Sequence, residues 1–125
     1  MSILNHLIEH TWTTKVGLKA WSTLIYLDDQ ISHRCGYVEC IDPDAEGMAD
    51  LSVHGGVTWQ RGVDTAYNFG VPTVGFDCMH AWDNSIEHPH RNELDGKVRS
   101  LPYVIAQCEK LANQVDTLQK ASYSV

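Results

Sequence analysis

Two short segments of the sequence concentrate residues that could bind a ligand or carry out acid–base chemistry. The first is His54-Gly55-Gly56-Val57-Thr58, in which an imidazole and a hydroxyl flank two glycines. Paired glycines let a backbone approach a ligand closely, and a nearby histidine can transfer a proton. The alternative is a β-bulge beside a histidine that simply packs in the core.

The second segment is Gly75-Phe76-Asp77-Cys78-Met79-His80, which reads as the end of a strand and is followed by Ala81-Trp82-Asp83. Strand alternation predicts that Asp77 faces away from Phe76, Cys78 and His80. An aspartate close to a histidine can orient the imidazole and select its tautomer. Alternatively, Asp77 only bonds neighbouring backbone. The two segments together give the candidate ligand-binding residues His54, Gly55, Gly56, Thr58, Asp77, His80 and Asp83.

Two further patterns have residue types that can bind metal. His6-Leu7-Ile8-Glu9-His10 matches the H-x-x-E-H signature of inverted zincins, but little chain precedes it to bury a zinc ion. We favour the solvated face of a short helix. A structural zinc site could combine His33, Cys35, Cys40, Cys78 and His80. Because no C-x-x-C pair is present, buried free thiols are the simpler interpretation, with Cys35 and Cys78 on one face of the sheet. We therefore predict no metal and no cofactor.

The negative charge is concentrated in one segment. The chain has nine Lys+Arg and sixteen Asp+Glu, and its formal net charge is −7. Such a chain is poorly suited to bind nucleic acid or an anionic membrane directly. Residues 39–50 contain no Lys or Arg but include the acids Glu39, Asp42, Asp44, Glu46 and Asp50. These are candidates for contact with a protein that has a basic surface, and a solvated loop is the alternative.

The sequence patterns that indicate helices and strands predict a single α+β domain over residues 1–125. Residues 2–12 have an apolar stripe at helical spacing and predict a short helix with Ser2 as its N-cap. Strand composition covers residues 18–27, 35–41, 51–59 and 71–78, and residues 79–100 read as a long loop.

The last element is the clearest. From Leu101 to Leu118 apolar residues recur at spacings of three and four, with Ser100 as a natural N-cap and Pro102 in the first turn. We expect an antiparallel sheet of about four strands, with a short N-terminal helix and a long C-terminal helix packed on it.

The chain has the composition expected of a cytoplasmic protein. No apolar run approaches the roughly 20 residues of a membrane span, and the first residues lack the basic region of a secretion signal. The four cysteines show no pattern of a disulfide framework, which is consistent with a reducing compartment.

With both central segments and the closing helix considered together, the sequence resembles a family of small phage and prophage proteins of unassigned function. That family is marked by H-G-G-x-T, then G-F-D-C-x-H, then a closing helix, and residues 54–58 and 75–80 match these motifs. Further matches are Trp12, Thr13, Gly17, residues 34–38, Tyr103, Val104, Cys108, Glu109, Leu111, Ala112 and Gln114. The resemblance implies a viral or mobile-element origin and no particular reaction.

Three functions are compatible with these features. The first is a small acidic phage or mobile-element accessory protein that binds and inhibits a host component in the host cytoplasm, as an anti-CRISPR-like antagonist of host defence. The alternative is a small-ligand-binding protein or a metal-assisted hydrolase that uses the His/Asp cluster. The third is an architectural protein that forms a homo-oligomer through the C-terminal helix. Convergence of His54, Asp77, His80 and Asp83 in one pocket would favour the second function.

Overall fold

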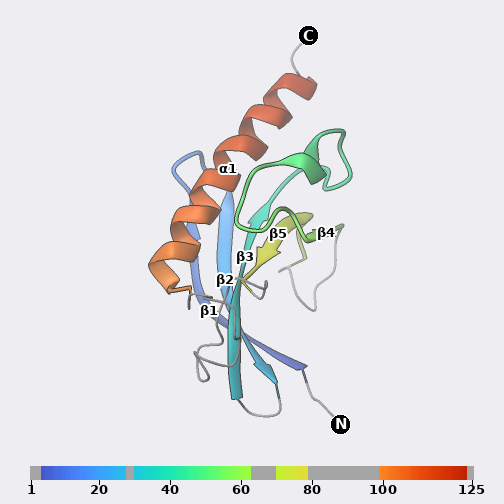
Figure 1. The fold of residues 1–125 in the computed structure, drawn as a ribbon. Coiled ribbons are helices and arrows are strands. Elements are labelled where there is room, and N and C mark those ends of the chain that lie inside the picture. The colour runs from blue at the N-terminus through green and yellow to red at the C-terminus, as the bar shows by residue number, and fades with distance from the viewer. Residues whose placement is uncertain (1–3, 28–29, 63–69, 79–98, 124–125) are drawn as a thin grey trace.

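A five-stranded antiparallel sheet carries one long helix across a single face (Figure 1). The computed structural model describes residues 4–27, 30–62, 70–78 and 99–123. Along the chain the elements are β1 (Leu4–Thr13), β2 (Lys19–Leu27), β3 (Gln30–Glu39), a 3-10 turn (Met48–Asp50), β4 (Trp59–Arg61), β5 (Thr73–Asp77) and α1 (Leu101–Tyr123). The strand order is β1-β2-β3-β5-β4, and every adjacent pair is antiparallel. The predicted α+β class is confirmed.

The predicted N-terminal helix over residues 2–12 is wrong, because the described part of this segment is strand β1. β1 pairs with β2 from Leu4 opposite Leu27 to Thr13 opposite Lys19. Two residues of the predicted helical stripe do not face a core, since Leu7 is 51% exposed and Ile8 is 47% exposed. Pairing with β2 therefore determines the conformation of this segment, although the local spacing of its apolar residues also fits a helix. The H-x-x-E-H interpretation required a helix and loses its basis.

The remaining predicted elements are confirmed in part. Strands at 18–27 and 71–78 correspond to β2 and β5, whereas the strand predicted at 35–41 begins earlier, at Gln30, and ends at Glu39. The strand predicted at 51–59 is wrong: residues 51–58 form an irregular segment with a turn, and only Trp59–Arg61 pairs with β5. The loop predicted at 79–100, with His80 and Asp83, lies almost wholly outside the described residues.

The main core lies between α1 and the sheet. The predicted helical stripe is confirmed, because Val104, Cys108, Leu111, Ala112 and Val115 are completely buried. Their partners on the sheet include Ala20, Val38, Val74 and Phe76. Each buried Val or Leu side chain contributes roughly 1.5–3 kcal/mol relative to an exposed one. Because this stripe packs on the chain's own sheet, self-association through α1 stays a prediction that would have to use its outer face.

In the described part of the chain, no helix is both long enough and apolar enough to cross a membrane.

A second, smaller cluster occupies the face of the sheet opposite α1. It consists of Trp21, Ile25, Cys35 and Tyr37, with Trp59 and Val71 packed against it. Alternation along β2 and β3 explains the division, because Ala20 and Val38 face α1 while their neighbours Trp21 and Tyr37 face the other way. The two faces of the sheet thus have separate sets of buried side chains.

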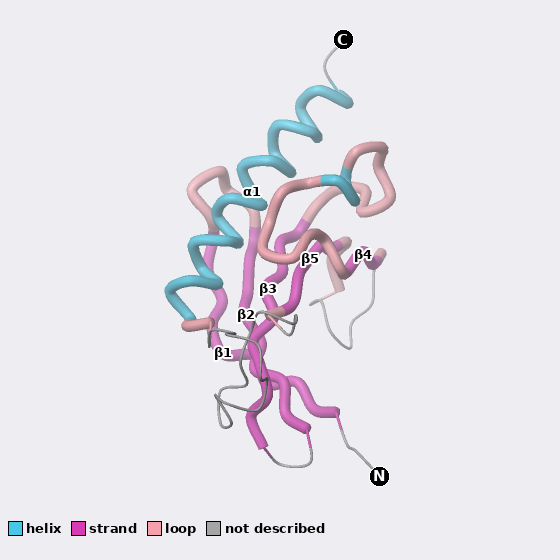
Figure 2. The backbone as a smooth tube through the Cα atoms, in the orientation of Figure 1, coloured by secondary structure: helices cyan, strands magenta, loops and turns pink. Residues whose placement is uncertain are grey.

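Residues 40–58 form no regular pairing of their own, and glutamines of α1 bond their backbone. Gln119 accepts from the Ile41 amide at 2.6 Å, and Gln107 accepts from the His54 amide at 2.9 Å. Gln114 both accepts from the Ser52 amide at 2.8 Å and donates to the Ser52 carbonyl at 2.6 Å. These contacts hold the segment along the helix (Figure 2). They replace the ladder bonds that a strand would have supplied.

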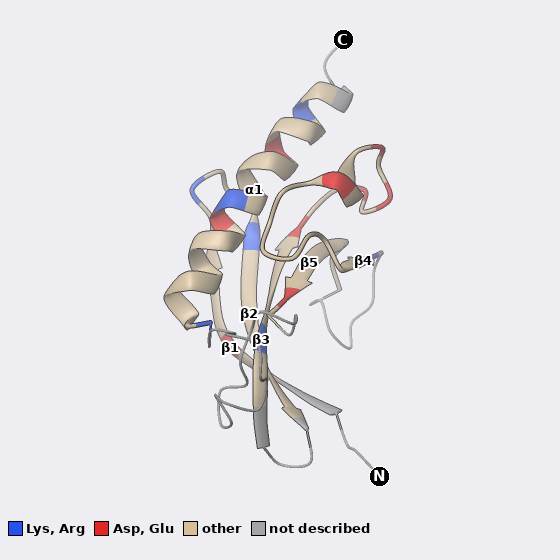
Figure 3. Ribbon diagram, in the orientation of Figure 1, with Lys and Arg blue, Asp and Glu red and all other residues tan. Residues whose placement is uncertain are grey.

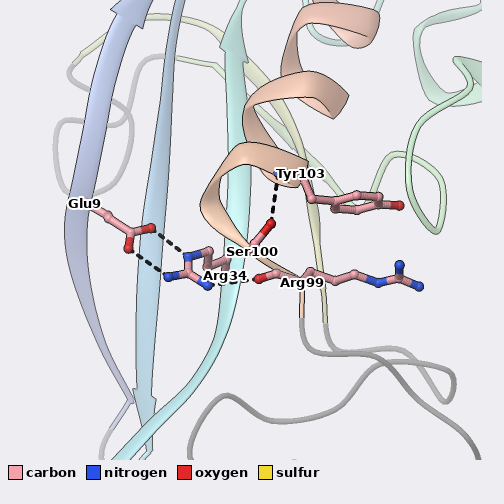
Figure 4. A network of polar contacts seen from close by, with 5 residues as sticks. All are labelled: Glu9, Arg34, Arg99, Ser100 and Tyr103. Atoms are coloured by element: carbon pink, nitrogen blue, oxygen red, sulfur yellow. Dashed lines mark hydrogen bonds and ion pairs between the residues drawn. The ribbon is translucent and has the colours of Figure 1, made fainter.

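The beginning of α1 is fixed to the sheet by a polar network (Figure 4). Arg34 of β3 donates to both carboxylate oxygens of Glu9 on β1, at 2.8 and 3.0 Å, and to the Arg99 carbonyl at 2.9 Å. Ser100 is the N-cap as predicted, since its hydroxyl oxygen accepts from the Tyr103 amide at 3.3 Å. One guanidinium therefore connects two strands and the helix start.

At the other end of β1, Glu109 of α1 binds the β1–β2 connection. One of its carboxylate oxygens accepts from the Trp12 indole at 3.1 Å, and the other accepts from the Lys15 amide at 3.2 Å. Trp12 and Glu109 are both among the residues that carry the family resemblance, and they lie 97 positions apart in the sequence. The opening and closing segments of the motif pattern therefore meet in space.

We expect Arg34→Met to lower the free energy of unfolding by about 2 kcal/mol. The Glu9 and Arg34 side chains are 18% and 16% exposed, so the loss should fall below the roughly 3–5 kcal/mol of a fully buried pair. Urea unfolding of Glu9→Gln, Arg34→Met and the double variant measures the coupling. The double variant should lose less than the sum of the single losses, and simple additivity would contradict this role of the ion pair.

Candidate functional site

A row of aromatic side chains crosses the sheet on the face opposite α1. Trp21 of β2 lies opposite Tyr37 of β3, Tyr37 lies opposite Gly75 of β5, and Gly75 lies opposite Trp59 of β4. The Trp21 and Tyr37 rings stack with centroids 5.6 Å apart, and Tyr37 and Trp59 meet edge to face at 5.8 Å. Such pairs add about 0.5–1.5 kcal/mol to their area burial.

Gly75 makes the contact between Tyr37 and Trp59 possible. A Cβ at this position would lie 2.6 Å from the Gly36 carbonyl oxygen and 2.6 Å from Cδ1 of Tyr37. The tyrosine ring therefore lies over the glycine backbone and reaches the indole beyond it. This explains why the second motif begins with glycine: a side chain at this position would collide with the β3 backbone and with the Tyr37 ring.

The next row along the same face contains Thr23, Cys35 and Asp77, which are cross-strand partners. A pocket of about 250 Å³ opens on this face of the sheet. It is lined by Ile25, His33, Cys35, Tyr37, Thr58, Trp59, Phe76 and Asp77. The floor is buried and mostly apolar, whereas Thr58, Trp59 and Asp77 lie at the more exposed rim.

The ionisable groups on the floor of the pocket stay neutral at physiological pH. Burial raises the pKa of the Cys35 thiol from 9.0 to about 12; the Asp77 charge acts in the same direction, and hydrogen bonds with Tyr37 and Thr23 oppose it. Burial also raises the pKa of Tyr37 far above its ordinary value, with a further contribution from Cys35. Since the thiolate is the reactive form, Cys35 is not suited to nucleophilic catalysis.

The structure brings together only part of the predicted ligand site. Thr58 and Asp77 both line the pocket. His54 lies elsewhere, on the α1 side, where its Nδ1 is 2.7 Å from the Tyr103 hydroxyl and its ring packs edge to face on Tyr103 at 5.4 Å. His80 and Asp83 lie outside the described residues. The structure therefore does not bring His54 and Asp77 together as predicted, because the sheet lies between them.

The glycine pair of the first motif forms a turn outside the strands, so it is not a β-bulge. The Gly56 amide donates to the Val53 carbonyl at 2.8 Å, and Gly55 and Gly56 have φ angles of 68° and 84°. Both angles lie in the left-handed region that glycine adopts without steric cost. The turn directs His54 toward α1 and returns the chain toward the sheet.

The two sequence motifs contact each other in two places. The Thr58 amide donates to the Gly75 carbonyl at 2.9 Å, which fixes Thr58 at the pocket rim. The His54 ring lies 6.5 Å from the Phe76 ring, between the sheet and α1. The first motif therefore packs on the second, and both motifs contribute to the pocket and to the buried region beneath α1.

Six pocket residues were not among the candidate ligand-binding residues predicted from the sequence: Ile25, His33, Cys35, Tyr37, Trp59 and Phe76. The spacing of positions 33, 35 and 37 did contain a usable signal, because residues two apart on a strand share a face. What was missing was the pairing of β3 with β5, which places that face beside Asp77.

The cysteines of the zinc hypothesis do not lie together. Cys35 belongs to the cluster opposite α1 and Cys78 to the core beneath α1, so the two thiols lie on different faces of the sheet. The expectation that they share a face was wrong because β3 and β5 pair Cys35 with Asp77. Among the described residues, no three His, Cys, Asp or Glu side chains are grouped closely enough to hold a metal ion.

Four of the five predicted partner-binding acids are exposed: Asp42, Asp44, Glu46 and Asp50. Glu39 is half-buried and accepts from the Lys19 amide at 2.6 Å, so it has a structural role. Figure 3 shows several Asp and Glu positions, in red, on the irregular segment after β3. Burial raises the pKa of the neighbouring Cys40 thiol to about 12, and the charges of Asp42, Glu39 and Asp44 raise it further.

The chain matches no family model, and searches of curated proteins and of solved structures found no match. Function is therefore inferred from the described side chains and from the motif resemblance. Two regions stand out, the pocket opposite α1 and the acidic segment after β3.

Replacement of the Cys35 thiol should change how stability depends on pH. A thiol with a raised pKa stabilises the fold fully below pH 9, and this stabilisation is lost as pH rises from 9 toward 12. Between these limits the unfolded chain releases a proton that the folded chain keeps. In this range the unfolding free energy of Cys35→Ala should therefore fall less steeply with rising pH than that of the wild type, by about 1.4 kcal/mol per pH unit. Identical slopes in urea titrations at pH 9–11 would contradict the assignment.

His54→Ala should destabilise the fold by about 2–3 kcal/mol, because it removes a buried ring and its hydrogen bond to Tyr103. Tyr103→Phe should cost about 1 kcal/mol. His10→Ala, at an exposed position of β1, serves as the control and should cost about 0.5 kcal/mol. Thermal unfolding measures all three. An unchanged midpoint for His54→Ala would show that the imidazole is not a structural element.

Proposed function

We propose that the protein is a small acidic accessory protein of a phage or mobile element that binds a basic surface of a host component and inhibits it. The target class that fits best is a host-defence complex, as for anti-CRISPR proteins, in the host cytoplasm. The observation that carries the proposal is the exposure of Asp42, Asp44, Glu46 and Asp50 on one segment that the fold holds in place. The motif resemblance supports the viral origin.

The acidic segment is ordered before any partner binds. The Asp42 carboxylate accepts from the Asp44 amide at 3.0 Å, and Gln60 of β4 donates to the Pro43 carbonyl at 2.8 Å. Met48 is completely buried beneath the segment. An ordered segment loses little conformational entropy on binding, so more of the contact free energy appears as affinity.

An apolar residue lies beside the acids. Ile41 is 57% exposed and borders a hollow of about 240 Å³ between the segment and α1. Asp42, Glu46, Leu118 and Gln119 also line that hollow. A central apolar contact with a charged rim is the usual composition of a protein–protein interface. A basic side chain of the partner could enter the hollow beside the two carboxylates.

The metal-assisted hydrolase alternative loses support because His54 bonds to Tyr103 of α1, whereas Asp77 lines the pocket on the opposite face of the sheet. Binding of a small ligand retains a specific observation in its favour, the pocket opposite α1. That pocket does not involve the acidic segment, so the two activities can be tested separately.

A plating assay tests the proposal with variants matched in charge. The protein is expressed in bacterial hosts that carry defined defence systems, CRISPR systems among them, and each host is challenged with a phage that its system restricts. Asp44→Asn/Glu46→Gln removes two exposed carboxylates from the segment and changes the net charge from −7 to −5. Thr11→Lys/Thr13→Lys makes the same change at exposed positions of β1.

We expect the wild type and the β1 variant to restore plating in one of the hosts, and the segment variant to restore it less. With the purified target, the segment variant should bind about fivefold more weakly, or about 1 kcal/mol, chiefly through slower association. Plating that no host regains would refute the inhibitor function. Equal losses in both double variants would show that net charge, and not the segment, determines binding.

A further inference from the structure

We propose that the pocket on the sheet face opposite α1 binds a small organic ammonium ion whose body is apolar or aromatic. The proposal concerns a different surface from the acidic segment and does not rest on the inhibitor function.

The shape of the pocket fits a small molecule. Its volume of about 250 Å³ lies just below the roughly 300–1,000 Å³ of pockets that take drug-sized ligands. Ile25, Cys35 and Tyr37 form a buried floor, and the raised pKa of Cys35 and of Tyr37 keeps that floor uncharged. A ligand must therefore place an apolar part on the floor and direct its polar part to the rim.

The charge of the pocket favours a cation. Asp77 is the lone carboxylate among the described lining residues, and no Lys or Arg lines the pocket with it. The Thr58 hydroxyl and the His33 imidazole add further hydrogen-bonding groups to the lining. The lining offers an anionic ligand no Lys or Arg side chain, whereas an ammonium group can donate a charge-assisted hydrogen bond to Asp77.

The aromatic walls suit the organic part of such a ligand. Trp59 and Tyr37 meet at an interplanar angle of 79°, which makes a corner with one ring edge and one ring face. Aromatic faces attract organic cations through their quadrupole, and tryptophan does so best. The chain itself provides an example, since the guanidinium carbon of Arg61 lies 4.9 Å from the centroid of the Trp59 ring.

The pocket is preformed by contacts that do not involve a ligand. The bond from the Thr58 amide to Gly75 fixes one side, and the β3–β5 register places Asp77 opposite Cys35 on the other. Gly75 lets the Tyr37 ring lie flat across β5. A preformed site needs little rearrangement to bind, so even a small probe should give a measurable affinity.

The test is an NMR titration of the full chain at pH 7 with 2-phenylethylammonium, compared with its neutral analogue 2-phenylethanol. We expect amide shifts at Thr58, Gly75 and Asp77, a shift of the Trp59 indole signal, and at least about tenfold tighter binding of the ammonium compound. Asp77→Asn should remove this preference and leave binding of the alcohol unchanged. Trp59→Leu should weaken binding of the ammonium compound about fivefold.

Asp116→Asn provides the matched control. It removes one carboxylate from α1, on the other side of the sheet, where Asp116 pairs with Lys120 at 2.9 Å. Its affinity for the ammonium compound should equal that of the wild type. Equal wild-type affinities for the two probes, shifts away from the pocket, or equal losses in Asp77→Asn and Asp116→Asn would each overturn the proposal. The wild-type comparison decides the question even if Asp77→Asn does not fold.

Discussion

The pairing of β5 with β3 is the interaction on which the rest of the structure depends. It places Gly75 opposite Tyr37 and Asp77 opposite Cys35, while Phe76 between them points to α1. Because side chains alternate strictly, a slip of one residue would bring Asp77 into the core and Phe76 out of it. The same register therefore determines the core beneath α1, the pocket on the opposite face and the separation of His54 from Asp77.

A second constraint follows from the irregular course of residues 40–58. Backbone groups that have no strand partner must be satisfied in another way, and three glutamines of α1 do this. The helix thus has two roles: its apolar stripe covers the sheet, and its polar flank holds the segment that carries the acids. An exposed charged surface of fixed shape is the result, and it is the feature on which the proposed partner contact rests.

The sequence predicted those features that depend on local spacing. The stripe from Val104 to Val115 identified α1, and Ser100 identified its first residue correctly. β1 could not be identified in this way, because its apolar spacing also fits a helix and only pairing with β2 decides between them. The glycine pair at 55–56 was misread for a related reason, since a turn is defined by a contact between Val53 and Gly56 and not by composition.

The candidate site was predictable to the same extent. Thr58 and Asp77 were identified from the motifs in which they occur, whereas Tyr37 and Trp59 join them only through the register of three strands. The most direct measurement of that register is a NOESY spectrum of the full chain. The structure predicts cross-peaks from the Tyr37 ring to the Gly75 α protons and to the Trp59 indole, and from Cys35 to Asp77. Cross-peaks from Asp77 to Cys108 or Leu111 of α1 would contradict it.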